Sequence, residues 1–120
     1  MKFVWDHFNY HVTDTKRSIA FYEKTLGMKV IREMGSDEGP VHFVMMGYDD
    51  SNVVLELKWE KAHEGSYDTG DRSYHFCVKT EDIEEAIKLY QEMGIITQQM
   101  GDHGCFIQDP DGYLIEILKK

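Results

Sequence analysis

Positive charge, cysteine and long apolar runs are all scarce in this chain. Its 13 lysines and arginines face 22 aspartates and glutamates, so the formal net charge is −9 and nonspecific binding to nucleic acid or an anionic membrane is not expected. No apolar stretch approaches the roughly 20 residues of a membrane span, and the N-terminus carries no basic segment followed by an apolar core. We therefore expect a soluble, cytoplasmic protein with no membrane partner.

Cysteine is limited to Cys77 and Cys105, which do not form a CxxC pattern. This spacing excludes a disulfide framework and a zinc knuckle. Each cysteine is expected to behave as a small apolar residue within a strand. The 120 residues are 42% hydrophobic and 12% aromatic, which favours one compact domain with a real core over a disordered chain.

Two halves of the sequence are similar to each other. HFNYHVTDTKRSIAFYEKTLGM, starting at His7, matches HFCVKTEDIEEAIKLYQEMGI, starting at His75, and each half ends in a short apolar strand with a central glutamate, VVLEL and YLIEIL. The spacings agree as well, because Ile19 and Ile87 each lie 12 residues after the opening histidine. The chain is therefore predicted to contain a duplicated supersecondary unit rather than a longer repeat array.

Each half is predicted to have the order βαβββ, which makes the domain α+β. In the first half, strands are expected at 2–12, 29–34, 41–47 and 53–59, with a turn at 49–52 and a helix at 16–26 that has Ile19, Tyr22 and Leu26 on one face. In the second, strands are expected at 72–79, 95–100, 104–108 and 113–118, with a helix at 81–93 and its inward residues at 83, 86, 87 and 90. Helix caps at Asp14 or Thr15, stops at Gly27 and Gly94, and a DPDG turn at 109–112 separate these elements. One domain, 1–120, would thus hold two modules at about 1–60 and 71–120, joined by a polar linker.

Strand alternation gives the repeated histidines and glutamates an unusual setting. Glu116 lies on one face with Leu114 and Leu118, although a lone buried carboxylate costs several kcal/mol or becomes protonated. One strand histidine is often a hydrogen-bonded structural residue, and one strand glutamate usually faces solvent. Two of each at matching positions instead favour a divalent metal site, with two nitrogens and two oxygens from His7, Glu56, His75 and Glu116. His42, His63 and His103 are expected at the surface, and His11 is either a substrate contact or a solvated residue.

These segments, with YDTGDRSYHFCV and DPDGYLIEIL, give the chain a resemblance to the vicinal oxygen chelate (glyoxalase/bleomycin resistance/dioxygenase) superfamily, most closely to glyoxalase I (lactoylglutathione lyase). The resemblance covers nearly the whole length. It implies paired βαβββ modules around a barrel-like cavity, a metal held by His7, Glu56, His75 and Glu116, and a role in methylglyoxal detoxification. A histidine at the first ligand position resembles the short bacterial enzymes, which implies Ni2+ or Co2+ before Zn2+.

The resemblance also implies a mechanism and a cosubstrate. The hemithioacetal of a 2-oxoaldehyde and glutathione, or another thiol, would isomerise to a 2-hydroxyacyl thioester through an enediolate, with Glu116 as the base and Glu56 as its partner. His11 stands where glyoxalases usually carry an arginine that grips glutathione, so His11 and Arg72 are the expected substrate contacts. A homodimer is expected. The alternatives are an acyl-CoA epimerase, an iron dioxygenase and a noncatalytic ligand-sequestering protein.

Overall fold

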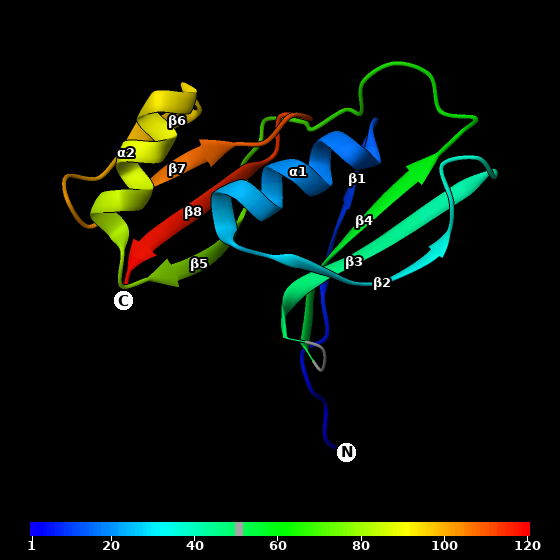
Figure 1. The fold of residues 1–120 in the computed structure, drawn as a ribbon, viewed down its shortest axis with the longest axis horizontal. Coiled ribbons are helices and arrows are strands. Elements are labelled where there is room, and N and C mark those ends of the chain that lie inside the picture. The colour runs from blue at the N-terminus through cyan, green and yellow to red at the C-terminus, as the bar shows by residue number, and fades with distance from the viewer. Residues whose placement is uncertain (50–51) are drawn as a thin grey trace. The chain divides into compact units, whose positions relative to one another are not determined.

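The structure, a computed structural model, describes residues 1–49 and 52–120 and contains two compact units, Met1–Tyr67 and Asp68–Lys120. The first unit contains β1 (Phe8–His11), α1 (Thr15–Leu26), β2 (Lys29–Gly35), β3 (Val41–Asp49) and β4 (Asn52–Glu60). The second contains β5 (Phe76–Thr80), α2 (Ile83–Met93), β6 (Ile96–Gln99), β7 (Gly104–Gln108) and β8 (Leu114–Lys119). The predicted βαβββ order is confirmed in both halves, and Figure 1 traces it along the chain. The turn predicted at 49–52 includes residues 50 and 51, which lie outside the described residues.

Both units have the same sheet topology. The strand orders are β1-β4-β3-β2 and β5-β8-β7-β6, so the first strand of each unit lies beside the last. These two strands run parallel, whereas the other neighbours are antiparallel hairpin partners. A parallel pair requires a crossover connection, and the helix with the two strands after it supplies that connection here.

Alternation along the strands separates a core face from a second face. In the first unit, Val44 pairs with Leu57 and Met46 with Leu55, and all four are almost completely buried. In the second unit, Ile107 pairs with Ile115 and Cys105 with Ile117, with the same degree of burial. Because Glu56 and Glu116 alternate with these residues, they lie on the opposite face of each sheet.

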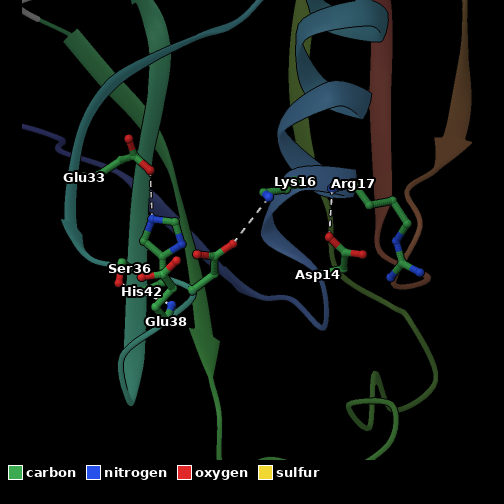
Figure 2. A network of polar contacts seen from close by, with 8 residues as sticks. Asp14, Lys16, Arg17, Glu33, Ser36, Glu38 and His42 are labelled. Atoms are coloured by element: carbon green, nitrogen blue, oxygen red, sulfur yellow. Dashed lines mark hydrogen bonds and ion pairs between the residues drawn. The ribbon is translucent and has the colours of Figure 1, made fainter.

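Helix α1 packs against β2 and β4 and is capped at both ends. The Asp14 side chain accepts a hydrogen bond from the Arg17 backbone N–H at 3.0 Å, shown in Figure 2, and Gly27 ends the helix in a left-handed conformation with φ 66°. The buried stripe contains Ser18, Tyr22 and Thr25, while Ile19 and Leu26 are only half-buried. The apolar pattern thus identified the helix and its cap, but small hydroxyl residues occupy more of the packed face than it indicated.

Helix α2 packs against β7 and β8, with Ile83, Ile87 and Tyr90 buried as predicted. It begins at Ile83 instead of residue 81, because the Thr80 hydroxyl oxygen accepts a hydrogen bond from the Asp82 N–H and holds these residues in a turn. No helix among the described residues is long and apolar enough to cross a membrane.

Both opening strands are shorter than predicted. Residues 2–7 form no strand, and Phe3, Val4 and Trp5 are exposed, because the parallel ladder begins only where Phe8 meets Leu55. In the second unit the ladder begins where Phe76 meets Ile115, and residues 72–75 precede it. A strand requires a paired neighbour, so β-propensity alone overestimated both segments.

Two local features fix the position of β8, the strand that carries Glu116: a hydrogen-bonded turn before it and a close backbone contact with β7 beside it. The buried Asp109 carboxylate accepts hydrogen bonds from the backbone N–H groups of Asp111 and Tyr113, both at 2.9 Å, which confirms the DPDG turn. On the neighbouring strand, a Cβ atom built on Gly104 would lie 2.3 Å from the Ile117 carbonyl oxygen. Only glycine fits there without displacing β8.

The two helix caps offer a matched stability test. Replacing Asp14 by alanine should lower the free energy of unfolding by about 1 kcal/mol, because it removes the hydrogen bond to the Arg17 N–H. Replacing Asp82, whose side chain makes no capping hydrogen bond, should cost only about 0.3 kcal/mol through the helix dipole. Urea unfolding measures both losses, and equal losses would contradict this role of the Asp14 side chain.

Candidate metal centre

The first half-site consists of His7 and Glu56. His7 lies one residue before β1, and Glu56 lies in the middle of β4. The parallel ladder places Asn9 opposite Glu56, which brings the histidine two residues earlier close to the same carboxylate. His7 Nε2 is 3.6 Å from Glu56 Oε1.

The second half-site consists of His75 and Glu116 and repeats this geometry. His75 lies one residue before β5, and the ladder places Cys77 opposite Glu116 in β8. His75 Nε2 is 3.6 Å from Glu116 Oε1, the same separation as in the first half-site. Equal ladder register and equal separation in both units show that the duplication extends to the placement of these side chains.

Both carboxylates need a positive partner. The side chains of Glu56 and Glu116 are only 15% and 19% exposed, which makes an uncompensated negative charge costly. Metal ligands with bonds of about 2.1 Å lie about 3.0–3.5 Å apart in octahedral or tetrahedral sites, so separations of 3.6 Å suit two ligands of one ion. Within either unit, the described residues form no group of three or more such ligands. Each half-site therefore offers one nitrogen and one oxygen atom as candidate ligands.

Two further side chains hold the first half-site in place. The Asp6 carboxylate accepts a hydrogen bond from His7 Nδ1, and the other ring nitrogen, Nε2, faces Glu56. On the other ligand, Asn9 Nδ2 donates a hydrogen bond to Glu56 Oε1 at 3.0 Å. Contacts of this kind orient the ligands of protein metal sites. The sequence interpretation missed both residues, although Asp6 adjoins His7 and Asn9 was expected on the same face as His7.

The surroundings of the second half-site are different. The His75 ring meets the Phe106 ring edge-on, with 4.9 Å between centroids. Both cysteines lie in strands as expected, but Cys77 is largely exposed, whereas Cys105 is buried. Partial burial, with a hydrogen bond to Glu116 and the negative charge of that carboxylate, raises the pKa of the Cys77 thiol to about 11.

The remaining predicted residues occupy several different environments. His11 pairs in register with Lys58, and its ring meets Tyr67 edge-on, while Tyr67 stacks on His63 at 3.6 Å. We call His11, His63 and Tyr67 the aromatic cluster. Arg72 has a left-handed backbone, φ 56°, and its guanidinium donates a hydrogen bond to the Gln108 side chain.

His42 corrects the prediction that it lies at the surface. It is only 7% exposed, and its Nε2 lies 2.8 Å from Glu33 Oε1 across the β2–β3 hairpin, as Figure 2 shows. The histidine has a strand position on the core face of β3, so its burial follows from sheet alternation. His63 and His103 are exposed, as predicted.

Comparisons with known proteins agree with this arrangement. Residues 5–117 match the family described as Glyoxalase/Bleomycin resistance protein/Dioxygenase superfamily. Lactoylglutathione lyases of Neisseria meningitidis and Salmonella typhimurium are each 33% identical to the chain; the matches cover 95% and 94% of this chain and 88% and 90% of those proteins.

Solved structures give the same result. Glyoxalase I of Leishmania major, described as trypanothione-dependent, superposes with a TM-score of 0.83 at 33% identity over 94% of this chain and 84% of that one. Glyoxalase I of Zea mays has a TM-score of 0.81 at 27% identity, covering 95% of this chain and 43% of that one.

The two βαβββ units and their matching histidine–glutamate pairs define a protein of the vicinal oxygen chelate fold. The chain belongs to the Glyoxalase/Bleomycin resistance protein/Dioxygenase superfamily. Within it, the chain is an enzyme of the glyoxalase I-like type, which confirms the predicted fold and enzyme class.

The Cys77–Glu116 contact has a measurable consequence for thiol reactivity. Because the pKa of Cys77 is raised to about 11, its thiol stays protonated at neutral pH, and alkylation by iodoacetamide should accelerate only as the pH approaches that value. A Glu116→Gln substitution removes the carboxylate charge and should shift this acceleration to lower pH. Peptide-resolved mass spectrometry measures the rate at Cys77.

The same charge change at Glu84, an exposed residue of α2, serves as the control and should leave the Cys77 profile unchanged. Rapid labelling of Cys77 at pH 8 in the unsubstituted protein would contradict the contact.

Proposed function

We propose that the protein is a metal-dependent lactoylglutathione lyase, glyoxalase I, which isomerises the hemithioacetal of a 2-oxoaldehyde such as methylglyoxal and a thiol. The observation that supports this most strongly is the repeated geometry of the two half-sites, each with a histidine nitrogen 3.6 Å from a largely buried carboxylate oxygen. The names of the similar curated proteins and solved structures support the same reaction.

One divalent cation would complete both half-sites. Two ligands from one unit are too few to hold an ion firmly, so His7, Glu56, His75 and Glu116 together form the proposed ligand set. Imidazole and carboxylate ligands suit Ni2+ and Co2+, which we favour, and also Zn2+. When bound, the ion would supply Lewis-acid stabilisation of the negative charge that develops on the two adjacent substrate oxygens.

The protein residues would carry the proton transfer. Glu116 takes the proton from the carbon that bears sulfur, and the electron pair of that C–H bond forms the enediolate. Glu116 then returns this proton to the neighbouring carbon, while the hydroxyl proton of the sulfur-bearing carbon passes to the former ketone oxygen and the carbonyl of the thioester forms. The product is a 2-hydroxyacyl thioester, an isomer of the hemithioacetal, so no oxidant or reductant is required. Glu56 remains a ligand and is the candidate partner base for the other stereoisomer.

Glutathione is the proposed thiol, because lactoylglutathione is named in the similar curated enzymes. The Leishmania major relative is described as dependent on trypanothione, so the thiol varies among similar proteins. In this chain the aromatic cluster and Lys58 lie along the Glu56 face beyond Asn9 and are the proposed contacts for the thiol moiety, with Arg72 as a further candidate. We further propose a homodimer, which gel filtration with light scattering tests directly.

Replacing Glu116 with glutamine should lower turnover of methylglyoxal plus glutathione by at least about 100-fold, because the general base is lost. The amide has nearly the same shape, so the circular dichroism spectrum should remain that of the unsubstituted protein. Glu84→Gln is the matched surface control and should retain full activity. Full activity of the Glu116 variant would remove this residue from the role of base.

Metal affinity should fall as the pH drops below about 6, because free imidazole, with a pKa of about 6.5, binds a metal only when deprotonated. Calorimetric titration of chelator-stripped protein with Co2+ between pH 4 and 8 measures the change. Constant affinity down to pH 4 would contradict ligation by the two histidines.

A further inference from the structure

The two half-sites have the same geometry but different support. In the first, hydrogen bonds hold both ligands: Asp6 accepts from His7 Nδ1, and Asn9 donates to Glu56 Oε1 at 3.0 Å. The Glu56 carboxylate therefore has a partner that keeps it oriented whether or not an ion is bound.

At the matching positions of the second half-site, these two supports are replaced. Tyr74 precedes His75 and supplies no carboxylate, and the described residues include no hydrogen-bond partner for His75 Nδ1. Cys77 takes the place of Asn9 in an identical ladder position, opposite Glu116. Its thiol is a weak donor and is also placed to donate to the Val78 carbonyl oxygen, with Sγ and O 3.6 Å apart.

The geometry points to a division of labour between the units: Asp6 and Asn9 are positioning residues that hold His7 and Glu56 firmly, and Glu116 is the less firmly held of the two carboxylates. This inference rests on the proposed function and adds the residues that decide between two otherwise equivalent carboxylates. A charge-assisted amide hydrogen bond resists displacement of Glu56, whereas a thiol holds Glu116 weakly.

Metal affinity gives a readout that does not depend on turnover. In chelator-stripped protein titrated with Co2+, Asn9→Leu should weaken binding by about 10–100-fold, because the donor to Glu56 is lost. Asp6→Ala should weaken it within the same range. The matched substitution in the second unit, Cys77→Ala, should change the affinity by less than about threefold, since it removes only a weak donor.

Asn9→Gln keeps an amide donor and should recover part of the affinity lost in Asn9→Leu. Thermal unfolding of each metal-free variant checks that the fold is retained, and the glutamine variant keeps the test decisive if the leucine variant is unstable.

Exchanging Asn9 and Cys77 between the two half-sites tests which glutamate is held less firmly. In the unsubstituted protein, Glu116→Gln should reduce kcat more than Glu56→Gln does. The same two substitutions are then made in the double variant Asn9→Cys, Cys77→Asn, in which the amide holds Glu116. There the loss of kcat on Glu56→Gln, divided by the loss on Glu116→Gln, should be about tenfold larger than in the natural sequence.

The outcomes separate this inference from the proposed function. If the unsubstituted protein binds Co2+ and isomerises the hemithioacetal, but Asn9→Leu and Cys77→Ala bind Co2+ equally well, the positioning role is overturned and the proposed function stands. An unchanged ratio in the exchanged protein also overturns it. If the unsubstituted protein neither binds Co2+ nor isomerises the hemithioacetal, both proposals fail.

Discussion

The parallel pairing of the first and last strands in each unit is the constraint on which the rest of the structure depends. It brings together residues separated by most of a unit, because β1 lies beside β4 and β5 beside β8. The register then decides which side chains meet, and it is the same in both units, with Asn9 opposite Glu56 and Cys77 opposite Glu116. A shift by one residue would move each glutamate to the core face of its sheet. The helix and hairpins of a unit therefore also set the position of its half-site.

This arrangement places polar chemistry next to an apolar core without mixing the two. Leu55 and Leu57 complete the packing on one side of β4, while Glu56 between them faces the other. The same strand thus contributes both to stability and to the proposed ligand set. A largely buried carboxylate is costly in each unit, so the proposed cation would also stabilise the fold.

Much of this organisation was predictable from local sequence signals. The glycine stops, the Asp14 cap and the DPDG turn depend on short-range chemistry, and the structure confirms them. The predicted first residues of β1 and β5 were wrong, because pairing with a strand distant in the sequence determines where each strand begins. The prediction of a surface position for His42 was wrong, because His42 alternates along β3 with the buried Val44 and Met46. That all four proposed ligands surround one ion stays a prediction. The hydrogen bond from Asn9 to Glu56 could not be predicted, because a contact between residues 47 positions apart has no local signature.

Gly104, which belongs to neither half-site, affects the position of Glu116 through the backbone of β8. Any side chain there would collide with the Ile117 carbonyl, the backbone group directly after Glu116, and relieving the collision would push β8 outward by roughly an ångström. Errors of that size in the placement of a reacting group can reduce rates by about 100-fold. Substitutions near Glu116, the proposed base, are therefore limited by the neighbouring strand β7. Directed-evolution libraries that aim to alter activity would do well to leave this position unchanged.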